Sequence, residues 1–317
     1  MQDMTHRITE DLSRVRFDNH DSCTSCGRNF VEGETTHLGV VKGGTPAYLC
    51  DSCSEKLVET SARYRYSPRP FQIPDKDSIL WRYIDFTKYV SLLFTKSLFF
   101  SRADNLKDPF EGAKGIKSRK GIWDEHYLEF FRKIIRNPPP GTAFNKTDPE
   151  VENEARKLLT DLEKGGRFLT QHTFINCWHE NPTESEAMWK LYSGSVNAVA
   201  IKTTYQRLYE ALGENTSINI GRVQYMDFQN GFAGPNNAFW RKRKSLEHER
   251  EVRALIYDFE ANTEGLTISC NLNRLVDQVI VSPTAPDWYF DLINDLNKKY
   301  NISTRVTKSA LSEPPFY

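Results

Sequence analysis

Apolar residues after residue 78 follow two repeating patterns, which predict short strands with helices between them. Continuous or alternating apolar runs predict strands, and they lie at 79–83, 97–101, 173–178, 198–203, 218–225, 252–257, 266–270, 276–281 and 302–306. Apolar positions three and four residues apart predict helices, which we place at 86–93, 184–193, 205–212, 238–248 and 287–300. This mixture favours an α+β domain with a mixed, largely antiparallel split sheet.

The predicted helix after residue 183 carries signals for both of its ends. Thr183 with Glu186 three residues later is a capping-box arrangement, which predicts Thr183 as the N-cap. Gly194 suits the C-terminal end, where glycine adopts a left-handed conformation without strain. Ala187, Met188, Leu191 and Tyr192 are expected to share one apolar face.

Composition divides the chain into four parts. A polar segment at 1–20, expected to be a short helix or a frayed end, precedes a cysteine-containing module at 21–60. Three prolines within residues 68–74 disfavour a helix and predict an extended linker at 61–78. The main domain follows at 79–317, with a helical insert at about 113–170 that is broken by prolines 138–140 and by a turn at 145–149.

Four cysteines form two C-x-x-C knuckles, with 23 residues between the knuckles: Cys23, Cys26, Cys50 and Cys53. Each knuckle brings two thiolates to one ion, and two knuckles complete the tetrahedral shell of a structural zinc site. A disulfide pair or four buried thiols are the alternatives. Zinc is favoured because the spacing is doubled and the polar start of the sequence carries no secretory signal, so we expect reduced thiols and a cytoplasmic protein.

The segment that holds the knuckles resembles the zinc-binding domain of ClpX unfoldases. The C-x-x-C-G start matches residues 23–27, and the Y-x-C-D-x-C end matches residues 48–53. The resemblance covers about 40 residues and implies a small treble-clef or ribbon module, with a hairpin between the knuckles and a helix from about residue 54. It also implies that the module recognises a protein partner.

The overall charge gives no indication of a highly charged partner. Lysine and arginine total 42, as do aspartate and glutamate, so nucleic-acid binding is possible but not supported by net charge. No apolar run approaches the about 18 residues of a membrane span, so no membrane partner is expected. The basic run at 241–244 reads as a solvated helix face balanced by Glu247, Glu249 and Glu251.

Three stretches combine polar and aromatic residues in a fixed order along the main domain. They lie at 80–83 with 99–101 and 108–111, at 177–180 with 188–194, and at 244–253. Together they resemble the bacterial family described as domain of unknown function number 2971. The resemblance covers residues 79 to about 290, with Lys107 in place of an asparagine. It suggests a role in bacterial stress or phage defence without implying a reaction.

The order of an arginine, a serine and a Glu-x-Glu pair also resembles ADP-ribosyltransferases, which bind NAD between two small sheets. The resemblance implies catalytic roles for Arg82, Ser101, Glu249 and Glu251. Arg82 would hold the pyrophosphate and Ser101 would brace the catalytic glutamate. Glu251 would stabilise the oxocarbenium-like ribose, and Glu249 would orient or deprotonate the acceptor. Only 18 residues separate Arg82 from Ser101, and no Ser-Thr-Ser triplet is present.

Further residues of the three stretches are candidates for substrate or cofactor binding: Tyr83, Asp108, Glu111, His179, Trp189, Tyr192 and Arg253. Trp189 and Tyr192 could stack on a nicotinamide or adenine ring. Each also has a structural interpretation: the aromatic residues and His179 as core, and Glu251 with Arg253 as a cross-strand ion pair. Arg82 could pair with Asp108 or Glu111, and Cys177 and Cys270 read as core residues.

Two other classes of function compete with the transferase. A metal-dependent nuclease or phosphoesterase would use oxygen and nitrogen ligands, with Asp104, Asp108, Glu111 and His179 as candidates. A non-enzymatic sensor or adaptor would use the zinc module and the main domain for binding alone.

Overall fold

The computed structural model describes residues 2–7, 22–23, 26–31, 35–40, 46–53, 63–64, 71–137, 144–215 and 217–317. The chain forms two compact units, and the first contains both the N-terminal part and a segment inserted into the sequence of the second. One unit contains Met1–Pro70 and Lys120–Leu162, and the other contains Phe71–Arg119 and Glu163–Tyr317. No helix in the described part of the chain is long and apolar enough to cross a membrane.

The N-terminal part of the first unit is a four-stranded sheet in the order β3-β2-β1-β4. Its strands are β1 (Gln2–Arg7), β2 (Thr35–Val40), β3 (Pro46–Cys50) and β4 (Arg63–Tyr64). The antiparallel pair β2–β3 confirms the hairpin predicted between the two knuckles. The expected helix near the N-terminus is wrong for residues 2–7, because β2 supplies ladder partners along all of β1. Residues 51–53 are helical, and the rest of the helix predicted from residue 54 lies outside the described residues.

The predicted helical insert is present as α3 (Lys120–Arg136) and α4 (Asp148–Gln171). Two ion pairs connect them: Arg132 Nε lies 2.7 Å from Glu152 Oε2, and Arg136 Nη2 lies 2.9 Å from Asp148 Oδ1. The start of α4 is fixed by the Glu150 carboxylate, which accepts hydrogen bonds from the Thr147 backbone and hydroxyl, as in a capping box.

The second unit is built on a nine-stranded sheet in which β14–β15 is the one parallel pair. Its main path runs through β13 (Gly265–Ser269), β6 (Ser97–Arg102), β7 (Thr173–Glu180), β5 (Ile79–Asp85), β8 (Ala198–Thr204), β14 (Gln278–Val281) and β15 (Arg305–Lys308). β12 (Glu251–Tyr257) pairs with β7, and β9 (Asn219–Arg222) pairs with β12. These strands confirm the predicted α+β class with a largely antiparallel sheet.

The sheet splits along one edge of β7. β12 pairs with β7 along its whole length, whereas the opposite edge is shared: β6 pairs with residues 174–175 and β5 pairs with residues 179–180. Two side chains bridge the gap between β6 and β5. Asn176 Nδ2 donates to the Phe99 carbonyl at 2.8 Å, and Arg82 Nη1 donates to the Cys177 carbonyl at 3.1 Å. They satisfy carbonyls that would otherwise lack ladder partners.

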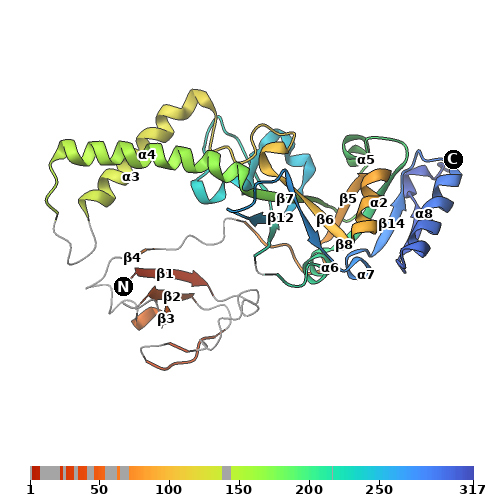
Figure 1. Cartoon of the computed structure of the whole chain (residues 1–317), viewed down its shortest axis with the longest axis horizontal. Helices are drawn as coiled ribbons and strands as arrows, with labels where there is room; N and C mark the ends of the chain where they lie inside the picture. Colours follow the sequence, from red (N-terminus) through yellow and green to blue (C-terminus); the bar gives the residue numbers. More distant parts are fainter. Residues whose placement is uncertain are drawn as a thin grey trace. The chain divides into compact units, whose positions relative to one another are not determined.

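Helices cover the two faces of this sheet unequally (Figure 1). The main core lies on one face, where strand residues pack against α2 (Phe86–Thr95), α6 (Tyr205–Ala211), α7 (Leu272–Leu275) and α8 (Asp287–Lys299). On the other face, α5 (Glu186–Tyr192) packs Met188 and Trp189 against Trp81 and Tyr83. The predicted helices at 86–93, 205–212 and 287–300 are therefore confirmed as core elements.

Three details of the sequence prediction are wrong. α5 is capped by Ser185 instead of Thr183, since the Ser185 hydroxyl accepts from the Met188 N–H. Trp189 is buried, whereas Leu191 and Tyr192 of the expected apolar face are exposed. The predicted helix at 238–248 is instead two 3₁₀ segments, η3 (Pro235–Trp240) and η4 (Lys244–Glu249), with the short strand β11 (Arg241–Arg243) between them. The predicted stop at Gly194 holds, with φ +68°.

Residues 71–78, which the sequence assigned to a linker, contact the second unit. The Phe71 ring lies 4.1 Å from the Trp240 ring between centroids. Gln72 pairs with Arg222 of β9, whose guanidinium also reaches the Ile73 carbonyl at 3.2 Å. Gly221 leaves room for Phe71, because a Cβ at this position would lie 2.2 Å from the ring.

The split of the sheet leads to a prediction for Asn176. Replacing it with alanine leaves the buried indole N–H of Trp178 and the partly buried Phe99 carbonyl without their partners. We expect Asn176→Ala to lower the free energy of unfolding by about 2 kcal/mol or more, measured by urea unfolding. Asn105→Ala, which removes a hydrogen bond from an exposed side chain, is the control and should change it by less than about 0.5 kcal/mol. Equal effects of the two variants would contradict a structural role for Asn176.

Candidate active site and metal centre

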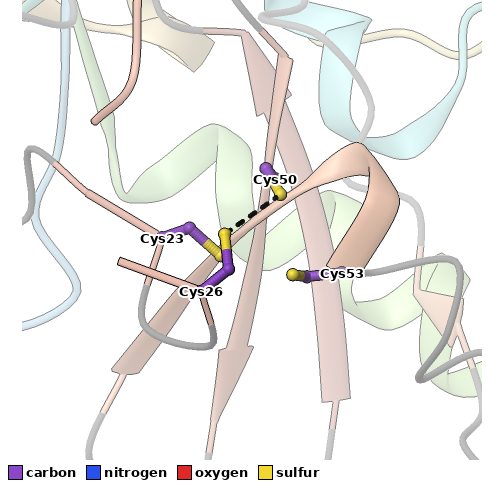
Figure 2. Close-up of side chains that lie close together, drawn as sticks. All are labelled: Cys23, Cys26, Cys50 and Cys53. Atoms are coloured by element: carbon purple, nitrogen blue, oxygen red, sulfur yellow. Dashed lines mark hydrogen bonds between the residues drawn. The ribbon is translucent and has the colours of Figure 1, made fainter. Parts of the chain in front are cut away.

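The four cysteines of the predicted zinc module converge in the first unit (Figure 2). Their sulfur atoms all lie within 4.8 Å of one another, and Cys26 Sγ lies 3.9 Å from Cys50 Sγ. A tetrahedral zinc site with Zn–S bonds of about 2.3 Å places its sulfurs about 3.8 Å apart. None of the four cysteines takes part in a disulfide, so the arrangement fits four ligands of one ion better than two disulfides.

Local backbone geometry explains how the first knuckle brings its two sulfurs together. The Gly27 N–H donates to the Cys23 carbonyl and the Cys23 N–H donates to the Arg28 carbonyl, each at 2.8 Å. Gly27 has φ +73°, a conformation that glycine adopts at little steric cost. The second knuckle begins at Cys50, the last residue of β3, where Leu49 and Phe30 pack beside the sulfurs.

The candidate active site lies in the second unit, on the face of the sheet that carries α5. Side chains alternate along β12, so Glu251 and Arg253 point to this face and Val252 points to the main core. The cross-strand partner of Glu251 is His179 of β7, and that of His179 on the other edge is Trp81 of β5. Register therefore brings residues from three strands to one place.

Five charged side chains form a buried network at this place. Arg253 Nε donates to Glu251 Oε1 at 2.8 Å, and Arg253 Nη1 donates to Glu111 Oε2 at 2.9 Å. Lys242 Nζ donates to Glu249 Oε2 at 2.6 Å and to Glu251 Oε2 at 2.8 Å. The side chains range from 0% exposed for Arg253 to 11% for Glu249. Three carboxylates against two cations leave one net negative charge when all five are ionised.

Burial and charge act against each other on the pKa of Glu251. Burial raises the pKa, but the charges of Arg253 and Lys242, with hydrogen bonds from Lys242 and the Cys177 thiol, lower it to about 2. Burial lowers the pKa of Lys242, and the opposing effect of Glu251 and Glu111 raises it above its usual range. Both groups are therefore charged at neutral pH.

Glu249 is held by the turn that leads from η4 into β12. Arg250 adopts a left-handed conformation with φ 40°, and the His179 ring holds the Glu249 carbonyl through Nδ1 at 2.6 Å. The Glu249 carboxylate accepts a hydrogen bond from the Tyr192 hydroxyl at 2.7 Å. Tyr192 is 41% exposed, so Glu249 is the carboxylate nearest to solvent in the network.

Aromatic side chains lie beside His179 and beside the backbone of Glu251. The Tyr83 and Trp189 rings meet edge to face at 4.9 Å, and the Tyr83 ring lies 6.4 Å from the His179 ring. The Tyr225 hydroxyl accepts from the Glu251 N–H at 2.8 Å. Burial raises the pKa of Tyr83 to about 12 and raises that of Tyr225 further, so both hydroxyls stay protonated.

The structure brings together most of the predicted site residues: Tyr83, Glu111, His179, Trp189, Tyr192, Glu249, Glu251 and Arg253. The expectation that Arg82 joins them is corrected. Arg82 pairs across strands with Ile201 of the main core, so its side chain lies on the face of β5 opposite to the site. It donates to the Cys177 carbonyl and lies over the Trp178 ring. Ser101 pairs with Ile175 and therefore lies on the same face of the sheet as the site. Its hydroxyl, however, donates to the Arg102 carbonyl and not to a glutamate of the network.

The proposed nuclease ligands are used elsewhere. Asp104 pairs with Arg102 and Asp108 with Arg243, each at 2.7 Å, while Glu111 is bound by Arg253. Apart from the four cysteines, the described residues contain no group of three or more His, Cys, Asp or Glu side chains arranged around one ion. Asp104 and Asp108 are thus paired with arginines outside the network, whereas Glu111 belongs to the network.

Sequence reasoning missed Lys242 and Tyr225. The run at 241–244 is not a solvated helix face: Lys242 is buried in β11, which pairs in parallel with β10 (Gln224–Met226) and places Tyr225 opposite Lys242. Cys177, assigned to the core, also contacts the network through Glu251. The run at 241–244 is uniformly basic and shows no alternation of apolar and polar residues, and a strand of three residues is too short to recognise by pattern.

Comparisons with known proteins give little further information. No protein-family model matches the chain, and no curated protein is similar to it. Two solved structures are similar over most of this chain: Thermus sp. 2.9 DarT in complex with carba-NAD+, and the same protein in complex with ADP-ribosylated ssDNA. Their TM-scores are 0.34 and 0.35, with 9% sequence identity, and they cover 76% and 77% of this chain and 100% of the other chain. A likeness at this level establishes neither family nor activity.

The buried network leads to a prediction for Glu251. Glu251→Gln removes a negative charge that balances the buried charges of Arg253 and Lys242. We therefore expect it to lower the free energy of unfolding by about 3–5 kcal/mol at pH 7. The folded-state pKa of about 2 lies below the about 4.3 of an unfolded glutamate, so the stabilisation is complete above pH 4.3 and is lost as pH falls towards 2.

The difference in free energy of unfolding between wild type and Glu251→Gln should therefore become smaller below about pH 4.3. Urea unfolding from pH 7 to pH 3 measures it. Glu247→Gln is the matched control, because this neighbouring glutamate pairs with Lys244 at the surface. A constant difference across the pH range would show that Glu251 acts through packing instead of charge.

Proposed function

We propose that this chain is an NAD-dependent ADP-ribosyltransferase-like enzyme whose active site contains Glu249 and Glu251. We further propose that its zinc module recognises a protein partner. The observation that carries the proposal is the buried network of three carboxylates and two cations beside Tyr192. The net negative charge is preorganised, so it can stabilise positive charge that develops on a bound substrate.

The chemistry of NAD suits such a site. Cleavage of its bond between ribose C1′ and the nicotinamide nitrogen develops positive charge on the ribose, while the bonding electrons neutralise the pyridinium. Nicotinamide therefore leaves without a proton, whereas most glycosidases need a protonated carboxylic acid for their leaving group. Glu251 could not supply that proton, because its pKa is held at about 2.

The geometry favours different roles for the two glutamates from those the sequence suggested. Both oxygens of Glu251 are held by cations, and its side chain is 4% exposed, which suits a group that anchors the network. Glu249 lies nearer to solvent, and one of its oxygens has only the neutral Tyr192 hydroxyl as a partner. We assign to Glu249 the contact with the ribosyl cation and the acceptor's proton, and to the exposed Tyr192 ring a stacking contact, whereas the buried Tyr83 and Trp189 rings support the site from below.

The reaction then balances as follows. The bond from C1′ to nicotinamide breaks and nicotinamide takes its electron pair. A nucleophilic atom of the acceptor forms a bond to C1′ and releases its proton to Glu249, from which it passes to solvent.

For the first unit we propose a structural Zn²⁺ bound by Cys23, Cys26, Cys50 and Cys53. The convergence of their sulfurs supports it, and the donor set is the one that structural zinc prefers. Four protein ligands leave no open position, so the metal would stabilise the fold of the module and take no part in the transfer chemistry. A cytoplasmic, bacterial role in stress or phage defence remains part of this proposal through the family resemblance.

The catalytic assignment predicts that Glu249→Gln abolishes turnover without unfolding the protein. The amide keeps the shape of the side chain and loses the negative charge, so we expect a decrease in turnover of about 100-fold or more. The protein is incubated with labelled NAD and cell extract, and both nicotinamide release and transfer of label to macromolecules are followed. Glu247→Gln, on the same 3₁₀ segment, should retain activity.

Wild-type protein that neither binds nor consumes NAD in this assay would refute the transferase. If such inert protein retained its zinc and captured a protein through residues 21–60, the adaptor would replace the enzyme as the best proposal.

The zinc assignment predicts about one zinc per chain by elemental analysis of purified protein. Replacing all four cysteines of the knuckles with serine should remove the zinc and leave thermal unfolding of the second unit unchanged. Cys270→Ala is the control and should retain zinc, because this cysteine belongs to the main core. Stoichiometric zinc in the quadruple variant would overturn the assignment.

A further inference from the structure

Lys242 is the cation of the network that lies near all three of its carboxylates. It lies on β11, and its side chain is 8% exposed. Its ammonium has three N–H groups, and three carboxylates lie around it: Glu249 at 2.6 Å, Glu251 at 2.8 Å and Glu111 at 3.6 Å. Of the three carboxylates, Arg253 contacts Glu111 and Glu251, so Lys242 is the cation that connects Glu249 to the network.

The strand pair β10–β11 also fixes the backbone at the start of β12. Tyr225 lies opposite Lys242 in the parallel register, and its hydroxyl accepts from the Glu251 N–H. The same strand pair thus binds the main chain of Glu251 through Tyr225 and its carboxylate through Lys242. Both contacts hold Glu251, which lies two residues after the proposed catalytic residue Glu249.

We propose that Lys242 is a positioning residue that holds the carboxylates of Glu249 and Glu251 side by side, ionised, for the reaction. Two carboxylates that accept from one ammonium lie close enough to repel each other, and without the cation one of them would turn away or take up a proton. Lys242 prevents both outcomes while it leaves the second oxygen of Glu249 to Tyr192.

The charged and titratable groups that face Lys242 come from several elements. They are Glu111 of the turn after η1 (Ala103–Asn105), Cys177 of β7, Tyr192 of α5, Tyr225 of β10, Glu249 of η4, and Glu251 and Arg253 of β12. The thiol and both phenols are neutral at pH 7, since the pKa of each is raised by burial. Removing the ammonium therefore leaves three carboxylates with one cation, and protonation of a carboxylate becomes easier.

The test compares Lys242→Met with Lys244→Met, a lysine two residues away that is exposed and pairs with Glu247. Two measurements are made on the full chain: the pH dependence of NAD turnover, and the titration of glutamate carboxyls by ¹³C NMR. For Lys242→Met we expect turnover at pH 7 to fall at least about 10-fold and its acidic limb to move to higher pH. We also expect the Glu251 carboxyl to titrate at higher pH than in wild type, with Lys242→Arg restoring part of both effects.

The two measurements separate this inference from the proposed function on which its turnover part rests. If wild type consumes no NAD, the enzyme proposal fails and the carboxyl titration alone decides the role of Lys242. A Glu251 titration in Lys242→Met that matches wild type and Lys244→Met would overturn the positioning role, even if turnover fell. Should Lys242→Met fail to fold, Lys242→Gln, which keeps N–H donors at this position, is compared in the same way.

Discussion

The burial of Arg253 is the constraint on which the candidate site depends. A guanidinium with no exposed surface must have its charge and its donors satisfied within the protein. Glu111, Glu251 and the Phe239 carbonyl provide this, and they come from a turn after η1, from β12 and from η3. Glu111 lies 142 residues before Arg253 in the sequence, so these segments can reach their native positions only together, and this part of the unit should form cooperatively.

Ionic groups are used differently on the two sides of the sheet. On the main-core side, Arg82 bridges the split by donating to a backbone carbonyl and lies over the Trp178 ring, so its role is structural. On the other side, carboxylates outnumber cations, and one of them reaches towards solvent beside an exposed tyrosine. A surplus of buried negative charge destabilises a fold, and sites of this kind are retained where a function requires them.

The sequence predicted most of the strands and helices of the second unit, because each of these has a local apolar pattern that survives in the fold. It also indicated most of the site, since Glu249 precedes, and Glu251 and Arg253 begin, a strand whose alternation is visible. The grouping of Arg82 with them failed for a physical reason. Alternation defines the two faces of each strand, but which face of β5 matches which face of β12 depends on pairing through β7, which is not local. Lys242 was missed because a basic run is normally solvated, and its burial follows from partners 131 residues before it and 7 and 9 residues after it in the sequence.

The contacts of residues 71–78 define where an independently folding form of the second unit must begin. Phe71 fills the space above Gly221 and covers Trp240, while Arg222 binds the backbone and side chains that follow. A fragment that starts at Ile79, the first residue of β5, would expose an indole ring and leave a guanidinium with fewer partners. The boundary suited to isolation, crystallisation or fusion of this unit is therefore Phe71, eight residues before the first strand of its sheet.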